Sequence, residues 1–152
     1  RISYAYNESD QLVRTEIDAS ADGTIEGVFG FSYDDNGYRQ SLLRDNNGDG
    51  EYDHHRFYSH NAAGQLAGFV EDNDGDREPD YAESYLYNDD GILLGFTVDN
   101  DADGHFEQRE EYQFDADGNL LTIESRHSEG GGTWICDPPC PPPYEECICR
   151  AI

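Results

Sequence analysis

The sequence predicts an all-β fold of tandem 27-residue β-hairpins that form a coiled sheet, a rod or a β-solenoid. Three observations lead to this prediction. The 152-residue chain repeats itself every 27 residues, five times, without insertion or deletion. Aromatic residues separated by one residue recur in phase, with the two-residue period of a strand. A turn sequence follows each pair, and strict short repeats form stacks in which each unit contacts mainly its neighbours.

The first strand of each hairpin is identified by its aromatic residues, which an alternating pattern places on one face. These residues are Tyr4 and Tyr6, Phe31 and Tyr33, Tyr58, Tyr85 and Tyr87, and Tyr112 and Phe114. His60 replaces the second aromatic residue of the third unit. Ten strands do not remain a flat open sheet in water, so we expect the sheet to coil or fold over and shelter this face.

The turn and the return strand complete each hairpin. The turns end at Asp10, Gly37, Gly64, Gly91 and Gly118. Glycine at this place supplies a positive φ. The return strands are apolar, as in residues 93–98 and 120–123, although Arg39 stands where the other units have leucine.

Acidic loops connect the hairpins in four of the five units. They span residues 18–26, 45–53, 72–80 and 99–107 and share the pattern D-x-[DNS]-x-D-[G/R]-x-x-[DE]. Calcium takes about six to eight oxygen ligands, and side chains at loop positions 1, 3 and 5 with a carbonyl at 7 can surround it. Position 12, which closes an EF-hand site, is not systematically acidic here, whereas position 9 always is. We therefore predict compact calcium loops closed by the ninth residue, without flanking helices.

The predicted ligands occupy positions 1, 3, 5, 7 and 9, with position 7 contributing its carbonyl. They are Asp18, Ser20, Asp22, Thr24 and Glu26; Asp45, Asn47, Asp49, Glu51 and Asp53; Asp72, Asp74, Asp76, Glu78 and Asp80; and Asp99, Asp101, Asp103, His105 and Glu107. Carboxylates about 5 Å apart repel by roughly 3 kcal/mol per pair at an effective dielectric constant near 20. About four Ca²⁺ per chain would relieve this repulsion and couple metal binding to folding.

Two other interpretations of the loops remain open. Asp-Gly and Asn-Gly sequences also form ordinary polar turns, and magnesium is another candidate cation, although it retains its waters and disfavours all-protein sites. The first loop, with Ser20, and the third, with Arg77 in place of glycine, are expected to bind more weakly.

The pattern [YF]-x-[YF]-[ND]-x-x-G-x-L resembles the YD repeats, or RHS repeats, of bacterial secreted toxins, surface proteins and animal teneurins. This resemblance covers the array and implies β-hairpins. The inserted D-x-D-x-D-G-x-x-D loops are similar to the calcium loops of thrombospondin type 3 repeats, dockerins and EF-hands, which implies a metal. A toxin-enclosing shell is not implied, because it needs far more than five repeats.

The net charge of −25 limits the partners of the chain. A charge of this sign repels nucleic acid and anionic membrane surfaces and attracts cations. We therefore expect no nucleic-acid partner, and no apolar stretch is long enough for membrane insertion. Low hydrophobicity with high charge also fits disorder, but phase-locked repetition with 12% aromatic residues argues against it.

Three regions are predicted: the array over residues 1–127, a glycine-rich joint over 128–132, and a Cys- and Pro-rich tail over 133–152. The tail holds Cys136, Cys140, Cys147 and Cys149. We interpret these as disulfide cysteines with three possible intrachain pairings; interchain bonds and a zinc site are the alternatives. Clustered cysteines with calcium-type loops favour an extracellular or cell-surface location.

These features together predict a structural role. No nucleophile, phosphate-loop or zinc-hydrolase motif occurs, so we expect no enzymatic activity. The leading hypothesis is an extracellular, calcium-stabilised repeat protein that self-associates head to tail into a fibre or surface filament. The alternatives are a calcium-dependent adhesin or stalk module that binds glycans on its tyrosine rows, and a fragment of a toxin shell.

Overall fold

The computed structural model describes residues 1–127, 134–136 and 149–151. The described residues form twelve strands. They are β1 (Ile2–Tyr6), β2 (Leu12–Ile17), β3 (Gly27–Tyr33), β4 (Arg39–Asp45), β5 (His54–His60), β6 (Leu66–Asp72), β7 (Tyr81–Tyr87), β8 (Leu93–Asp99), β9 (Gln108–Phe114), β10 (Leu120–His127), β11 (Trp134–Cys136) and β12 (Cys149–Ala151). The all-β prediction is therefore confirmed. None of the described residues belongs to a helix with the length and apolar character needed to span a membrane.

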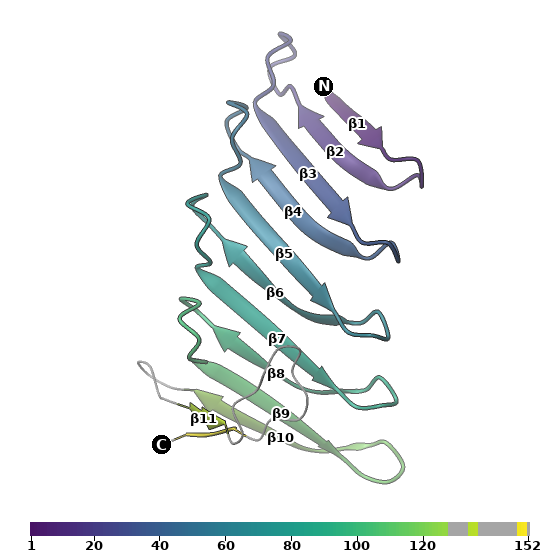
Figure 1. The fold of residues 1–152 in the computed structure, drawn as a ribbon, viewed down its shortest axis with the longest axis vertical. Helices are drawn as coiled ribbons and strands as arrows, with labels where there is room; N and C mark the ends of the chain where they lie inside the picture. The colour runs from purple at the N-terminus through teal and green to yellow at the C-terminus, as the bar shows by residue number, and fades with distance from the viewer. Residues whose placement is uncertain (128–133, 137–148, 152) are drawn as a thin grey trace. The chain divides into compact units, whose positions relative to one another are not determined.

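The first ten strands form one open antiparallel sheet in chain order, from β1 to β10 (Figure 1). The chain divides into two compact units, residues 1–82 and 83–152, with the division inside β7. In each unit the short hairpin turns lie at one end of the strands and the acidic loops at the other (Figure 1). The predicted tandem hairpins are thus observed, while coiling into a rod or solenoid stays a prediction.

All five hairpin turns share one hydrogen-bond pattern. An Asn or Asp side chain at the start of the turn accepts the backbone N–H groups two and four residues later, as Asn88 does from Asp90 and Ile92. The first turn residues are Asn7, Asp34, Asn61, Asn88 and Asp115. The fourth residue has a positive φ in every turn, 59° at Asp10 and between 78° and 85° at the four glycines. The prediction for these turn positions is confirmed.

Little apolar surface is buried in this sheet. Val28 and Val98 are the buried hydrophobic residues among those described, at 5% and 7% exposure. Tyr4 and Tyr6 remain 58% and 59% exposed, so the expected shelter of the aromatic face does not extend to β1. The ten strands form a single layer, and a strand in a single layer keeps both faces partly in contact with water.

Ring contacts connect successive strands of unit 1. Phe69 lies 6.2 Å from Tyr58 and 6.0 Å from Tyr81, measured between ring centroids. The two residues that depart from the repeat also make ring contacts. His60 stacks on Tyr38 at 5.2 Å, and the Arg39 guanidinium lies 5.0 Å from the centre of the Phe31 ring. These contacts compensate in part for the aromatic residue and the leucine that the other 27-residue repeats have at the positions of His60 and Arg39.

The tail forms a second, two-stranded sheet in which β11 pairs with β12. The Cα atoms of Cys136 and Cys149 are cross-strand partners in this sheet. The predicted joint at 128–132 lies outside the described residues, as do Cys140 and Cys147. The disulfide assignment remains a prediction.

Candidate metal sites

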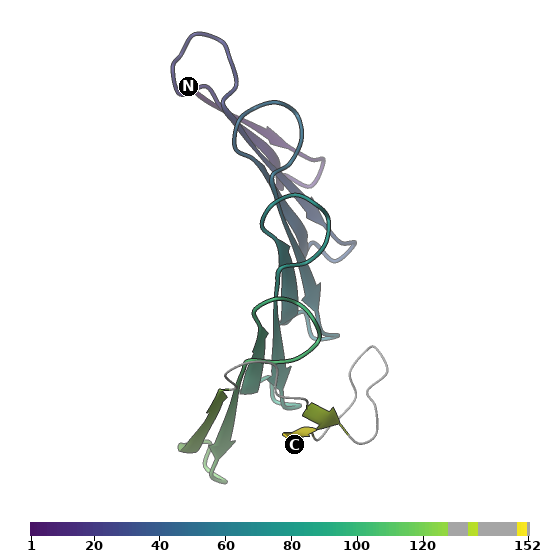
Figure 2. The same cartoon turned by 90° about the vertical axis from the view of Figure 1, so that its left-hand side faces the viewer.

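The four acidic loops begin where the return strands end. Loop 1 (18–26), loop 2 (45–53), loop 3 (72–80) and loop 4 (99–107) follow β2, β4, β6 and β8. Asp45, Asp72 and Asp99 are the last residues of their strands, and Asp18 comes directly after β2. Figure 2 shows each loop as an open, rounded ring. The strand fixes the backbone of the first aspartate, so that its side chain starts from the same place in every loop.

The first aspartates are among the most buried side chains of the described residues. Asp18, Asp45, Asp72 and Asp99 are 6%, 2%, 4% and 3% exposed. Three of them are more buried than Val28. Burial of a carboxylate is costly unless the charge is paired or well hydrogen-bonded. Among the described residues, four aspartates are buried but only two valines, so acidic side chains make up an unusually large part of the buried residues.

The same hydrogen bonds organise every loop. The backbone N–H at position 6 donates to Oδ2 of the first aspartate over 2.8–3.1 Å. The N–H at position 2 donates to the acidic side chain at position 9 over 2.6–2.7 Å. The N–H at position 9 donates to the carbonyl of the residue that precedes the loop. Positions 1 and 9 are therefore held facing each other across a closed ring.

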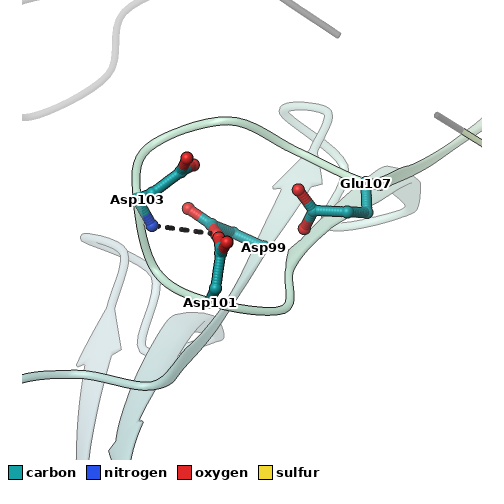
Figure 3. A group of neighbouring side chains, drawn as sticks. All are labelled: Asp99, Asp101, Asp103 and Glu107. Atoms are coloured by element: carbon teal, nitrogen blue, oxygen red, sulfur yellow. Dashed lines mark hydrogen bonds between the residues drawn. The ribbon is translucent and has the colours of Figure 1, made fainter. Parts of the chain in front are cut away.

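Three loops bring carboxylates close enough to share one cation. Oxygen atoms that bind one calcium at about 2.4 Å lie at most about 4.8 Å apart. In loop 4, one oxygen from each of Asp99, Asp101, Asp103 and Glu107 lies within 4.8 Å of the others. Figure 3 shows these carboxylates inside the ring of the backbone. Two further groups meet the same distance: Asp18, Asp22 and Glu26 in loop 1, and Asp72, Asp74 and Asp80 in loop 3.

The remaining predicted ligands do not belong to these three carboxylate groups. Asp49 and Asp53 form no such group with Asp45, and Asp76 is not part of the loop 3 group. The side chains of Ser20 and Asn47 make hydrogen bonds within their loops, Ser20 donating to Glu26 and Asn47 accepting from Asp49 N–H. At position 7 the backbone N–H groups of Thr24, Glu51, Glu78 and His105 donate to the aspartate at position 5.

Asp99 differs electrostatically from the first aspartates of loops 2 and 3. Burial raises the pKa of Asp99; the Gly104 N–H opposes this, and the negative charges of Glu107 and Asp103 raise the pKa further. Burial also raises the pKa of Asp45, but the N–H groups that donate to its carboxylate outweigh burial and leave the pKa below the ordinary value. In loop 4 the neighbouring carboxylates thus disfavour the charged form of Asp99.

Asp18 carries an unsatisfied oxygen. Its Oδ2 accepts the Gly23 N–H at 3.1 Å, but its buried Oδ1 has no hydrogen-bond partner among the described residues. This side chain is more than nine-tenths buried and belongs to the carboxylate group of loop 1. Buried polar atoms without a partner are uncommon and call for an explanation such as a bound ion.

Loop 3 contains two features that set it apart. Arg77 occupies position 6 with a φ of 77°, where the other loops have glycine. His55 Nδ1 lies 3.0 Å from Asp72 Oδ2, which also accepts the Arg77 N–H. Both oxygens of Asp72 therefore already have protein partners, since Oδ1 accepts from Gly75 N–H.

The contact of His55 with Asp72 does not follow from the repeat pattern, because the five histidines share no phase with it. His55 and Asp72 are cross-strand partners in the pairing of β5 with β6. The turn that ends at Gly64 joins the two strands, and antiparallel pairing continued from that turn brings His55 opposite Asp72. The side chain of His55 is 14% exposed and thus lies largely away from water.

Comparisons with known proteins bear on the fold. No protein-family model matches the chain, and no curated protein sequence matches it. Among solved structures, the Tc holotoxin pore of Photorhabdus luminescens, carrying a TccC3 mutation, matches with a TM-score of 0.62, 18% identity and coverage of 82% of this chain. A crystal structure of TcdB2-TccC3-Cdc42 matches with a TM-score of 0.62, 17% identity and coverage of 83%.

The likeness to these toxin components extends to the fold alone. The matched region is 5% of the chain in both solved structures. An all-strand array of antiparallel hairpins agrees with the resemblance to YD repeats. The interpretation of the acidic loops therefore depends on their own geometry.

Proposed function

We propose that the chain is an extracellular, calcium-stabilised structural module in which a metal ion in each acidic loop holds successive hairpins together. The observation that carries this proposal is the burial of four in-phase aspartates, each 6% exposed or less, in a sheet with few buried hydrophobic residues. A divalent cation turns this cost into a gain, because it neutralises carboxylates that otherwise repel one another.

Calcium fits the loops better than magnesium does. The candidate ligands are carboxylate, hydroxyl, amide and carbonyl oxygens, and calcium accepts larger and less regular oxygen shells than magnesium. Extracellular calcium modules bind with dissociation constants on the order of 10⁻⁴–10⁻³ M. Four ions would change the net charge of −25 to about −17. Calcium at extracellular concentrations then acts as a structural component.

The test compares the protein in millimolar calcium with the protein in EDTA. We expect native mass spectrometry to detect four bound ions, and circular dichroism to show loss of strand signal and a lower melting temperature in EDTA. Magnesium at the same concentration serves as the control and should restore less of the stability. An unchanged spectrum and melting temperature in EDTA would show that the loops are ordinary polar turns.

Head-to-tail self-association is the second part of this proposal. β10 is the last strand of the ten-stranded sheet and exposes Leu120, Leu121 and Ile123 by 50%, 65% and 54%. An exposed apolar edge strand readily pairs with another chain, and lysine on such a strand prevents pairing. A fibre follows if β10, as an edge strand, pairs with β1 of the next copy.

A matched pair of leucine variants tests the association. Leu121→Lys places a charge on the edge strand, whereas Leu86→Lys places the same charge on β7, an interior strand with a similarly exposed leucine at 58%. We expect multimers of the unaltered protein and of Leu86→Lys in light scattering at millimolar calcium, and their loss with Leu121→Lys. Monomers of the unaltered protein at high concentration would contradict the fibre.

A glycan-binding module is the second candidate function. The exposed rings of Tyr4 and Tyr6 favour it, because uncovered aromatic faces can stack on sugars. Binding to a glycan array that disappears in EDTA and with Tyr4→Ala would support this candidate over the fibre.

A further inference from the structure

In unit 1 the fourth position of one acidic loop lies directly against the end of the preceding loop. A Cβ atom at Gly48 of loop 2 would overlap the Ile25 carbonyl oxygen, and would lie 2.8 Å from its carbonyl carbon and 3.3 Å from Glu26 Cα. A Cβ atom at Gly75 of loop 3 would lie 2.8 Å from the Tyr52 carbonyl oxygen and 3.2 Å from Asp53 Cα. These obstacles are backbone atoms, which cannot rotate away as a side chain can.

The backbone conformation alone does not require glycine at these two places. Position 4 has a left-handed φ in every loop, 75° at Gly48 and 82° at Gly75, but also 59° at Ala21 and 53° at Ala102. Alanine therefore occupies the same conformation in loops 1 and 4. The need for glycine at 48 and 75 comes from the close approach of the neighbouring loop.

The approached residues hold candidate metal ligands. Glu26 closes loop 1, where its carboxylate accepts the Ala19 N–H at 2.6 Å and the Ser20 hydroxyl at 2.8 Å. Asp53 closes loop 2 in the same way by accepting the Asn46 N–H at 2.7 Å. A displacement of the backbone at the ninth residue would carry its carboxylate away from the first aspartate.

Loop 1 provides the evidence that a ligand is involved. Its carboxylate oxygens from Asp18, Asp22 and Glu26 lie within 4.8 Å of one another. Asp18 is more than nine-tenths buried, and its buried Oδ1 has no hydrogen-bond partner among the described residues. A cation at this place would satisfy that oxygen.

We infer that Gly48 and Gly75 are positioning residues that couple the metal sites of loops 1, 2 and 3, an inference that rests on the calcium function proposed above. The fourth residue of each following loop supports the ninth residue of the preceding loop. Order in one loop therefore favours order in the next, and calcium binding at one site strengthens binding at its neighbour. Such coupling is reciprocal, because each ion raises the affinity for the other by the same factor.

Two alanine variants of loop 2 separate coupling from backbone strain. Gly48→Ala adds a Cβ atom against loop 1, whereas Gly50→Ala adds one at a φ of 96° with nothing within 4 Å. Calcium titrations followed by NMR report on each loop separately, through the amide of Gly23 for loop 1 and of residue 50 for loop 2. Gly104 in loop 4 reports whether the rest of the chain stays folded.

We expect Gly48→Ala to raise the calcium midpoint of Gly23 by about tenfold or more, although the substitution lies outside loop 1. Gly50→Ala should raise the calcium midpoint of loop 2 more than that of loop 1. This substitution makes no contact with loop 1 and can act on it only by weakening calcium binding in loop 2. Equal midpoints of Gly23 in the two variants would overturn the coupling and leave the calcium function standing. A Gly23 amide that does not respond to calcium in the unaltered protein would overturn both.

Gly75→Ala is the second variant, and it is the milder change because its shortest approach is 2.8 Å. It tests the coupling even if Gly48→Ala does not fold. We expect it to raise the calcium midpoint of the Gly50 amide in loop 2. An unchanged midpoint of Gly50 would contradict the inference for loops 2 and 3.

Discussion

At the residue scale, Arg77 is a site of local backbone strain. It adopts a φ of 77° at the loop position where Gly23, Gly50 and Gly104 adopt 90–96°. A side chain other than glycine in this conformation costs about 1–2 kcal/mol. We predict that Arg77→Gly stabilises the protein by about 1 kcal/mol, measured as the free energy of unfolding in urea at saturating calcium.

Gly50→Ala is the reciprocal control for Arg77→Gly, because it introduces the strain that the first substitution removes. A Cβ atom at Gly50 meets nothing within 4 Å, so the substitution reports backbone strain without a steric clash. It should destabilise the protein by a similar amount. Equal stability of the Arg77→Gly variant and the unaltered protein would show that the loop relaxes around the arginine.

Asp115 provides a pH-dependent contribution at the fifth hairpin turn. Hydrogen bonds from the Asn119 side chain and backbone, which favour the charged carboxylate, lower its pKa. A lowered folded-state pKa gives stability that is present above the unfolded-state pKa and is lost as pH falls through the folded-state value. We predict that Asn119→Ala raises the pKa of Asp115 towards that of a free aspartate, measured by carboxyl ¹³C NMR. An unchanged value would exclude the side-chain hydrogen bond as the main cause.

Some properties of the turn and loop residues can be predicted from the sequence, and others cannot. The positive φ of Gly37 and its equivalents follows from the turn chemistry, and the spacing alone places Asp99 and Glu107 in one loop. The burial of Asp99 does not follow from spacing, because it depends on where the strand ends. The need for glycine at position 48 has the same limitation, since its cause lies in the preceding loop, at Ile25 and Glu26.

At the element scale, the acidic loop is the unit that binds metal. Asp99→Asn removes a buried carboxylate whose neighbours are Asp101, Asp103 and Glu107. We predict that this variant binds one calcium ion fewer in native mass spectrometry, or binds it about tenfold more weakly, which corresponds to ~1.4 kcal/mol. Asp90→Asn removes the same charge from an exposed turn position and should retain all the ions. Equal loss in both variants would point to net charge instead of a site.

The strands follow the sequence pattern more closely than the packing does. The phase of the aromatic residues gives the ten strands, and the turn residues give their antiparallel pairing. The exposure of Tyr4 and Tyr6 could not be read from alternation, because alternation places two rings on one face without stating what covers that face. Coverage depends on a second layer, and the repeat contains no separate signal for one.

At the scale of the whole molecule, charge repulsion opposes folding when calcium is absent. The net charge is −25, and raising monovalent salt from about 0.01 M to about 1 M shortens the screening length from roughly 30 Å to roughly 3 Å. We predict that salt raises the melting temperature in EDTA and changes it much less in calcium. A melting temperature in EDTA that is independent of salt would show that repulsion does not limit stability.

The near absence of a shared hydrophobic interior has a consequence for how such a chain can vary. Each hairpin brings its own turn and strand pair, four of the five bring an acidic loop, and only Val28 and Val98 are buried hydrophobic residues in the described part. Excision of residues 46–72 would join Asp45 to Asn73 and leave an intact loop sequence in the correct phase. Gene duplication or recombination can therefore lengthen or shorten the array by whole units, without compensating substitutions elsewhere.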